Sequence, residues 1–542
     1  MQRKLGGKLA RRWGTVVLVA AVVAALPFGN AGATGTTERY VVVLAGQQTQ
    51  NGFQPTGTKT AIQAQVTKAG GTIVNDLSAQ IGVLVADSSN ALFDDALRGS
   101  SLFEEAAEDF KWKAFPTYDE AVASGQLTVM HEGASLPGGG PEVSNDTFEP
   151  LQWALRLICV NPDSRAGCTG TAGAEAVQSG SRLVQVGILD TGIDGNHPDF
   201  VDIDGTNVDC VNGADFVPLG LGVDPVPGTE DACVDNNFHG THVAGIVAAR
   251  AGNPTGLPAG PFVPGQPGTG IRGVAPNVTL IPVKVCDAAG YCYASSTAAG
   301  ITYAGDKKFE VINMSFFVDD DIFLESTEFK CMSDPVQRAF RKANERAIQY
   351  ARNQGVVPVA ALGNSDNDLA HPPEPYENEC EVVPAETQGV TGTMALGRDS
   401  EKAGYSNYGN GPTDVAAPGG NFALLSDTPN EFCEEQVLST IPLALGAYGC
   451  FQGTSMASPH AAGVAALIVS QFGRMGNDAG EPDVVMRPTE VESYLQSTTV
   501  DIGEPGYDEC FGNGRINALR AVLHDTSRVY DPTAPFCPEY AG

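Results

Sequence analysis

The stretch Gly453-Thr-Ser-Met-Ala-Ser-Pro-His460 runs directly into the almost entirely apolar segment Ala461–Ser470. A turn of small residues followed by such a segment predicts a helix that enters the middle of a domain, with Ser455 in its first turn. The free N–H groups and the positive dipole end of a helix N-terminus favour negative charge. Ser455 is therefore either a helix cap or a nucleophile whose oxyanion the helix end stabilises.

Two upstream stretches bear on this choice. Leu183–Ile193 is an apolar run with Asp190 and a glycine turn near its end, which predicts a buried parallel strand. Open α/β sheets bind their ligands at the carboxyl ends of such strands. Phe238–Ala249 predicts an apolar helix that His239 opens. Taken singly, the Asp could cap a loop, and His239 with His242 could be a zinc pair, although no glutamate completes a His-Glu-x-x-His pattern.

The three stretches present Asp, His and Ser in the chain order of the subtilisin triad. The chain thereby resembles the subtilisin-like serine peptidases, or subtilases, over about residues 145–525. A fourth stretch, Val356–Asn364, resembles the strand of that family that ends in the oxyanion-hole Asn. The resemblance implies an α/β fold in which a mainly parallel sheet lies between layers of helices.

The resemblance also implies a role for each residue. Ser455 would attack the scissile carbonyl, His239 would take its proton and return it to the leaving amine, and Asp190 would fix the imidazole tautomer. The Asn364 amide and the Ser455 N–H would hold the oxyanion. This chemistry requires no cofactor, and its substrates would be proteins or peptides.

The stretch Phe309–Phe317 resembles the substrate-pairing edge of the family, where a peptide adds as a strand. The family usually has small residues after the Ser, but here Phe316 and Phe317 follow Ser315. We expect these three residues to bind substrate and Phe317 to narrow the first specificity pocket; the alternative is that its ring packs inward. The acidic loop 365–381 predicts either a preference for basic substrate residues or a solvated surface.

Asp199, in His197-Pro-Asp199, stands where the family usually carries a calcium-ligating Asp. Calcium takes about six to eight oxygen ligands, and the resemblance supplies only this one. The loop that would carry the companion ligands is replaced by the Gly- and Pro-rich segment 252–270. Structural calcium is therefore a candidate cofactor, and the alternative is that Asp199 caps a turn.

Residues 1–33 have the basic, apolar and small-residue parts of a secretory signal, and Arg11-Arg12 leaves twin-arginine export open. The alternative is a membrane anchor. No later segment offers eighteen uninterrupted apolar residues. We therefore expect a secreted, extracellular protein that has no membrane contact after signal removal.

Residues 38–112 predict a small α+β domain with a β-α-β-β-α-β order. We expect strands at 39–44, 70–74, 81–85 and 101–105 and helices at 59–68 and 89–97. This ferredoxin-like order resembles the inhibitor-type propeptide of subtilases, which implies an intramolecular inhibitor whose tail occupies the cleft; the alternative is an independent binding domain. We expect maturation within or near a linker at 113–144, a catalytic domain at 145–525 and a tail at 526–542.

The twelve cysteines all follow the predicted propeptide and form no Cys-x-x-Cys pair, which is typical of disulfides in an exported domain. Sequential pairing is one of many connectivities: Cys159–Cys168, Cys210–Cys233, Cys286–Cys292, Cys331–Cys380, Cys433–Cys450 and Cys510–Cys537. The net charge of −32 argues against a nucleic-acid partner, because phosphate binding needs cations. We expect a monomer.

The sequence thus predicts a secreted serine endopeptidase made as a self-processing precursor. One alternative is a narrow-specificity processing peptidase, which the Phe316-Phe317 departure favours. Another is a catalytically inert binding protein on the same fold, which the presence of every triad residue disfavours.

Overall fold

The computed structural model describes residues 36–130, 146, 148–168, 172–202, 205–218, 230–252, 270–318, 334–371, 381–422, 433–478, 481–535 and 537. The elements described below all belong to one compact unit, Thr37–Gly542. The predicted signal at 1–33 and the pair Cys331–Cys380 lie outside the described residues.

A seven-stranded parallel sheet forms the centre of the larger part of the chain. Its strands lie in the order β12-β13-β9-β15-β16-β17-β18, and every neighbouring pair is parallel. The bounds are β9 Gln185–Asp190, β12 Ala214–Asp215, β13 Thr279–Lys284, β15 Val311–Met314, β16 Val357–Ala361, β17 Thr391–Leu396 and β18 Val415–Pro418. Their almost continuous apolar sequences reflect burial on both faces of the sheet.

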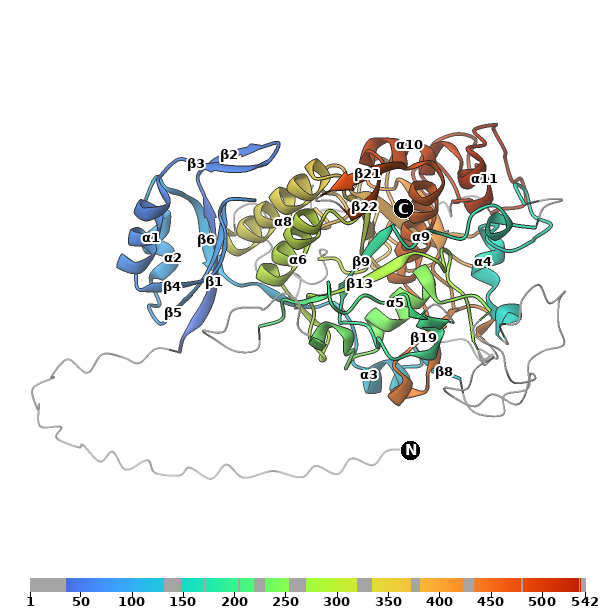
Figure 1. The fold of residues 1–542 in the computed structure, drawn as a ribbon, viewed down its shortest axis with the longest axis horizontal. Helices are drawn as coiled ribbons and strands as arrows, with labels where there is room; N and C mark the ends of the chain where they lie inside the picture. The colour runs from blue at the N-terminus through green and yellow to red at the C-terminus, as the bar shows by residue number, and fades with distance from the viewer. Residues whose placement is uncertain are drawn as a thin grey trace, which may run out of the picture. The chain divides into compact units, whose positions relative to one another are not determined.

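Helices cover both faces of this sheet, and the side chains of β9 alternate between the two layers (Figure 1). Val186 and Ile188 pack in a core with α5 and α9, whereas Leu189 packs in a core with α6 and α8. The helices are α4 Trp153–Leu157, α5 His239–Ala248, α6 Ala294–Lys307, α8 Pro335–Asn353, α9 Thr454–Phe472, α10 Pro488–Ser497 and α11 Ala518–Leu523. The predicted three-layer α/β class is confirmed.

The N-terminal part is a four-stranded antiparallel sheet in the order β4-β5-β1-β6 with two helices. Its elements are β1 Glu38–Leu44, α1 Lys59–Lys68, β4 Gly71–Leu77, β5 Val83–Ser88, α2 Phe93–Arg98 and β6 Phe103–Glu108. The α2 helix begins later than predicted, because the side chain of Asn90 accepts the N–H of Leu92 in a turn. A hairpin of β2 Gly46–Thr49 and β3 Gly52–Pro55 was not predicted.

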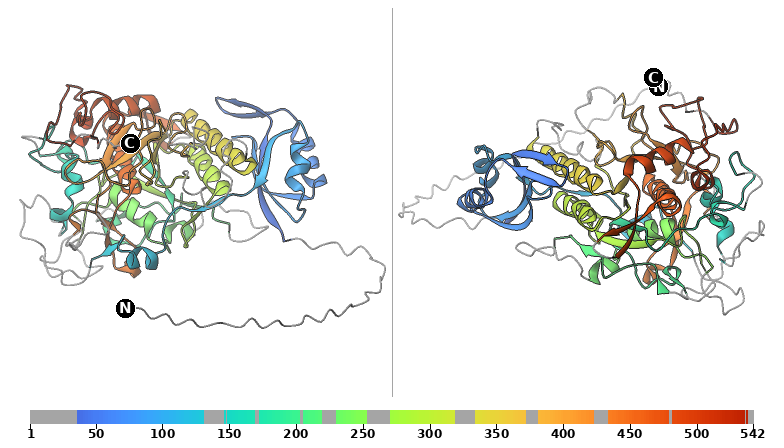
Figure 2. Two further views of the ribbon diagram at one scale, coloured as in Figure 1. Left: turned by 180° about the vertical axis from the view of Figure 1, so that it is seen from behind. Right: turned by 45° about the horizontal axis from the view of Figure 1, so that its top comes forward.

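This smaller sheet lies against α6 and α8, as Figures 1 and 2 both show. Along β1, Val42 packs toward α1 and α2, while Val43 joins the core of α6 and α8. Glu105 pairs with Arg338 at 2.8 Å, and Glu104 pairs with Lys342 and Arg346. An apolar face and an acidic edge of the sheet therefore both contact α8.

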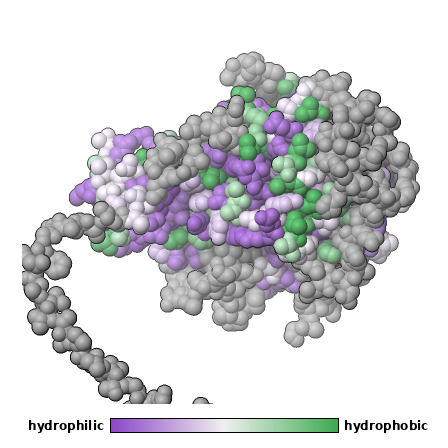
Figure 3. Space-filling view, turned by 90° about the horizontal axis from the view of Figure 1, so that it is seen from below, coloured by the Kyte–Doolittle hydropathy of each residue, from purple (hydrophilic) through white to green (hydrophobic). Residues whose placement is uncertain are grey.

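Short elements complete the described chain. They are β7 Lys111–Lys113, α3 Tyr118–Ala123, β8 Thr128–Val129, β10 Val201–Asp202, β11 Gly205–Thr206, β14 Tyr291–Tyr293, β19 Val437–Thr440, β20 Tyr448–Phe451, β21 Arg474–Asp478 and β22 Glu481–Val485. The five predicted sequential disulfides whose cysteines are described are all present. In the described part of the chain, no helix is both long and apolar enough to cross a bilayer. Figure 3 shows hydrophilic residues over much of the coloured surface on one face, with hydrophobic groups between them.

Candidate active site

The carboxyl end of β9 and the start of α5 bring Asp190 and His239 together. Nδ1 of His239 lies 2.9 and 3.0 Å from the two carboxylate oxygens of Asp190, and both side chains are buried. The N–H of Thr191 donates to the same carboxylate at 2.8 Å. Nε2 of His239 is buried and has no hydrogen-bond partner among the described residues. The imidazole is therefore oriented through one nitrogen, and the other remains available.

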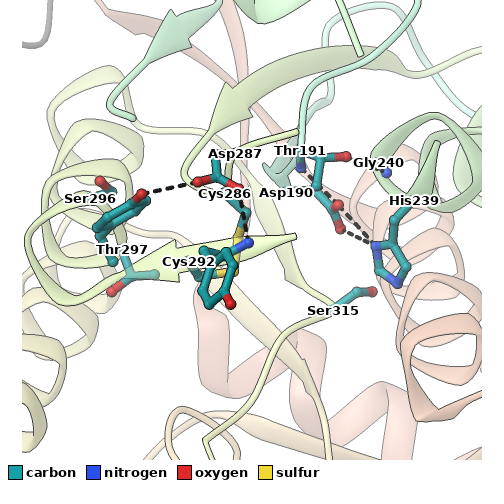
Figure 4. The surroundings of a disulfide bond; sticks show 12 residues. Asp190, Thr191, His239, Gly240, Cys286, Asp287, Cys292, Ser296, Thr297 and Ser315 are labelled. Atoms are coloured by element: carbon teal, nitrogen blue, oxygen red, sulfur yellow. Dashed lines mark hydrogen bonds and ion pairs between the residues drawn. A yellow bond between two sulfur atoms is a disulfide. The ribbon is translucent and has the colours of Figure 1, made fainter. Parts of the chain in front are cut away.

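Ser455 lies in the first turn of α9, as predicted. The residue before this helix, Gly453, has φ of 151°, which favours glycine. The Ser455 hydroxyl donates to the carbonyl of Ser315 at 2.8 Å, and the Ser315 hydroxyl donates back to the carbonyl of Ser455 at 2.8 Å. Figure 4 draws Ser315 in the surroundings of His239. The hydroxyl of Ser455 is thus bound to Ser315 and not to the imidazole.

Asn364 follows β16 and is held by the same helix start. Its side-chain oxygen accepts the N–H and the hydroxyl of Thr454, both at 2.9 Å. Because the amide oxygen is occupied in this way, the amide NH2 is the group left to donate elsewhere. The predicted oxyanion donor therefore lies beside the first turn that carries Ser455.

The residues predicted to bind substrate, Ser315, Phe316 and Phe317, follow directly after β15. Phe316 is buried, and its ring lies 6.3 Å from that of Trp112 in an edge-on arrangement. Phe317 is partly buried. Phe316 therefore packs inward against an aromatic residue of the N-terminal part.

The chain's own residues 111–115 lie across the site. The β7 strand pairs antiparallel with β14, and the N–H groups of Ala114 and Phe115 approach the Gly290 carbonyl at 2.9 and 3.2 Å. The Phe115 ring stacks on the His239 imidazole with 3.7 Å between ring centroids. This segment therefore covers the imidazole.

The following residues, 116–130, contact chain segments that precede His239 and Ser455. The amide of Asn237, two residues before the histidine, donates to the Pro116 carbonyl at 3.0 Å. The Tyr118 hydroxyl donates to the Leu445 carbonyl at 3.1 Å, and β8 pairs antiparallel with β20, four residues before Ser455. Residues 111–130 therefore contact β14, His239 and the segments just before His239 and Ser455.

Asp199 lies apart from these groups. Its buried carboxylate accepts the Ile271 N–H at 3.0 Å and a hydrogen bond from the Tyr448 hydroxyl, and burial raises its pKa. Both neighbours donate hydrogen bonds to the carboxylate, and the nearby Asp146 carboxylate also raises this pKa. Most of the loop expected to carry companion ligands, 253–269, lies outside the described residues. Calcium at Asp199 thus remains a prediction.

The alternative of a zinc pair finds no support in the geometry. His239 faces Asp190, whereas Nε2 of His242 lies 3.1 Å from the Gly449 carbonyl, and burial lowers the pKa of His242 to about 3. Where the structure describes the chain, one group of three could hold a metal ion: Asp368, His371 and Glu509.

The acidic loop 365–381 is described up to residue 371 and at 381. Asp366 pairs with Lys402 at 2.6 Å, and Glu381 pairs with Arg341 at 2.7 Å. Each of these carboxylates already has a cationic partner within the chain. Their charge is therefore partly balanced before any substrate binds.

Sequence reasoning missed the edge strand β14 and the residue Phe115. A three-residue strand is too short to show a period of two, and its partner β7 lies 180 residues away in the chain. The one local signal is Gly290, which precedes Tyr291–Tyr293 and follows the exposed residues 288 and 289. A glycine in that place marks a turn into a new element.

Comparisons with known proteins agree on one family. A family model described as the subtilase family matches residues 181–514. The thermophilic serine proteinase of Bacillus sp. (strain AK1) is 33% identical over 348 residues, which are 64% of this chain and 64% of that protein. Subtilisin Savinase of Lederbergia lenta is 31% identical over 374 residues, 69% of this chain and 99% of that protein.

Among solved structures, that of the epidermin leader peptide processing serine protease from Staphylococcus aureus aligns with a TM-score of 0.60. It is 19% identical and covers 90% of this chain and 98% of that one, which shows a shared fold. Together with the parallel sheet, these matches lead to one conclusion: the chain belongs to the subtilase family and is a subtilisin-like serine endopeptidase.

Proposed function

We propose that this chain is the precursor of a secreted endopeptidase that hydrolyses peptide bonds with Asp190, His239 and Ser455. Residues 1–33 would be the signal, 38–112 the inhibitory propeptide, 145–525 the catalytic domain and 526–542 a tail. The mature enzyme would be an extracellular monomer that needs no cofactor for its chemistry.

One observation carries this proposal: the chain's own residues 111–115 lie in the site as a peptide would. They add a strand to β14, which is the way in which extended peptides bind to an exposed sheet edge. Phe115 stacks on the imidazole expected to act as the base. A segment in this position supports both a peptide substrate and inhibition by the precursor's own N-terminal part.

In the proposed mechanism, the Ser455 hydroxyl turns from the Ser315 carbonyl to Nε2 of His239, which lacks a partner among the described residues. The imidazole then accepts the hydroxyl proton as Ser455 attacks the carbonyl carbon, and it protonates the leaving amine. Water enters the acyl-enzyme by the same base catalysis. Asp190, through Nδ1, keeps Nε2 free to accept and stabilises the imidazolium.

The tetrahedral oxyanion would be bound by the N–H of Ser455 and the amide NH2 of Asn364. Thr454 fixes the Asn364 amide before substrate arrives, so that orienting this donor costs no reorganisation in the transition state. The N-terminal end of α9 adds its dipole at the same place.

A peptidase of narrow specificity is a second candidate function, and the aromatic surroundings of Trp112 favour it. Its side chain is 2% exposed and contacts the rings of Phe316 and Phe340. A substrate that replaced β7 would present a side chain to the same aromatic surroundings. Cleavage of a peptide library would then show enrichment of aromatic residues at one position; equal cleavage across residue types would indicate a general degrader.

An irreversible fluorophosphonate tests the nucleophile directly. We expect one label per mature molecule, located on Ser455, no label in Ser455→Ala, and strongly slowed labelling in His239→Ala. Turnover of a peptide substrate should fall by at least about 10⁴-fold in both variants. A label on another residue, or full turnover by Ser455→Ala, would overturn the assignment.

A further inference from the structure

The disulfide Cys286–Cys292 joins two parts of the candidate active site (Figure 4). The cysteines are six positions apart, and both are fully buried. Between them lies a turn in which Ala288 and Ala289 are exposed. The covalent link therefore closes a short loop at the protein surface.

One end of the disulfide is tied to the strand that carries Asp190. The N–H groups of Val285 and Cys286 approach the backbone carbonyl of Asp190 at 2.9 and 3.2 Å. That strand end is held by the parallel pairing of β13 with β9. Cys286 is thus hydrogen-bonded to the end of the strand that carries Asp190.

The other end lies in the middle of β14, where Cys292 is opposite Trp112. Among the described strands, β7 is the one that pairs with β14. When residues 111–113 leave, β14 becomes an edge without a neighbouring strand. A three-residue strand in that state depends on its own loop for its conformation.

Hydrogen bonds to the carboxylate of Asp287 also stabilise the loop. This group accepts the N–H groups of Ala289 and Tyr291 at 2.9 and 3.0 Å and the Tyr293 hydroxyl at 2.9 Å. The turn also places Gly290, whose carbonyl accepts the N–H of Ala114. Covalent and polar contacts together hold the Gly290 carbonyl, which accepts backbone N–H groups of the chain's own residues 114 and 115.

We propose that the Cys286–Cys292 disulfide preorganises β14 for extended peptides and thereby sets their affinity, while the chemistry at Ser455 does not need it. This rests on the proposed function, in which β14 is the substrate edge. Ordering the backbone of one residue corresponds to about a tenfold change in an equilibrium constant. Opening the loop should therefore raise KM for peptides that reach β14 by about tenfold or more.

The test compares Cys286→Ala/Cys292→Ala with Cys159→Ala/Cys168→Ala, which opens another buried disulfide of nine-residue separation beside Asn517. A tetrapeptide p-nitroanilide reaches β14, whereas an N-acetyl amino acid ester does not. We expect the first variant to raise KM for the tetrapeptide about tenfold, with kcat within twofold and the ester unchanged. The control should change the two substrates equally or not at all.

An unchanged tetrapeptide KM would overturn the inference, and so would an equal loss on both substrates, which would indicate support of Asp190 instead. If the double variant is not exported, the same kinetics on wild-type enzyme after graded reduction, with mass mapping of alkylated Cys286 and Cys292, decide the question. Fluorophosphonate labelling accompanies each assay. A wild type that is neither labelled nor active refutes the proposed function, whereas a labelled variant with wild-type KM refutes only this inference.

Discussion

Replacing Trp112 by Ala should weaken the binding of the proposed propeptide to the proposed catalytic domain more than any other change in the β7 strand. The indole is 2% exposed and lies 5.1 Å from the Phe340 ring and 5.7 Å from the Phe110 ring. Its Nε1 has no hydrogen-bond partner among the described residues. The residue is therefore an apolar anchor between the two parts of the chain.

The expected magnitude follows from these contacts. Truncating a buried large aromatic residue costs about 3–5 kcal/mol. Removing a buried, unsatisfied N–H offsets about 1–2 kcal/mol of that cost. A net loss of about 2–3 kcal/mol corresponds to a roughly 30- to 150-fold weaker complex.

The assay starts from precursor that has been cleaved but whose N-terminal part is still bound. Peptidase activity is measured as this complex is diluted and the N-terminal part dissociates. Trp112→Ala should release activity at a correspondingly higher protein concentration than wild type. Lys111→Ala is the matched control, because this exposed side chain on the same strand only approaches the Tyr291 ring, at 5.3 Å, a contact worth about 1 kcal/mol or less. Equal dilution curves for the two variants would refute the anchoring role of Trp112.

Three further predictions concern the site and its cover. Asn364→Ala should lower kcat by about 10²–10³, a magnitude measured for such a donor in subtilisin itself, with little change in KM in steady-state kinetics. Asp109 accepts hydrogen bonds from Ser295, and burial raises the pKa of its carboxyl group from 3.8 to about 6. Because the bound state holds this proton more tightly than the free state, the affinity of the cut propeptide should fall by up to on the order of 100-fold as pH rises from 4 to 6. Inhibition measured across this pH range should show no such dependence for the Asp109→Asn propeptide. Gly240→Ala should abolish activity in the peptide assay, because its Cβ would lie 2.1 Å from the Gly192 carbonyl oxygen, whereas Gly404→Ala, with its nearest atom at 3.8 Å, should remain active.

Much of the fold could be predicted because local sequence patterns determine many of its helices and strands. The α1 helix has the bounds predicted for it, 59–68, and the apolar run before Asp190 forms the central strand β9. Sequential pairing of the cysteines was correct for the five pairs that the structure describes. The residues that determine α1 and β9 are close together in the sequence. A cysteine can form a disulfide only with another cysteine, so the number of possible pairs is small.

The contacts that residues 109–130 make with the candidate active site could not be predicted in the same way. Phe115 contacts His239, and Asp109 contacts Ser295, although the two residues of each pair are 124 and 186 positions apart in the chain. Neither residue belongs to a periodic pattern, and the contacts arise only when the small sheet lies on α6 and α8. The orientation of the Ser455 hydroxyl is likewise a tertiary property, since the Ser315 carbonyl that accepts it belongs to another strand end.

The most direct measurement is the intact mass of the exported protein, wild type beside Ser455→Ala. We expect the wild type to lose its N-terminal residues up to a bond within or near 113–144, and the variant to keep them after removal of the signal. The new N-terminus would also establish which of the residues 111–130 remain with the enzyme. Identical trimming of both proteins, or trimming of neither, would contradict self-processing by Ser455.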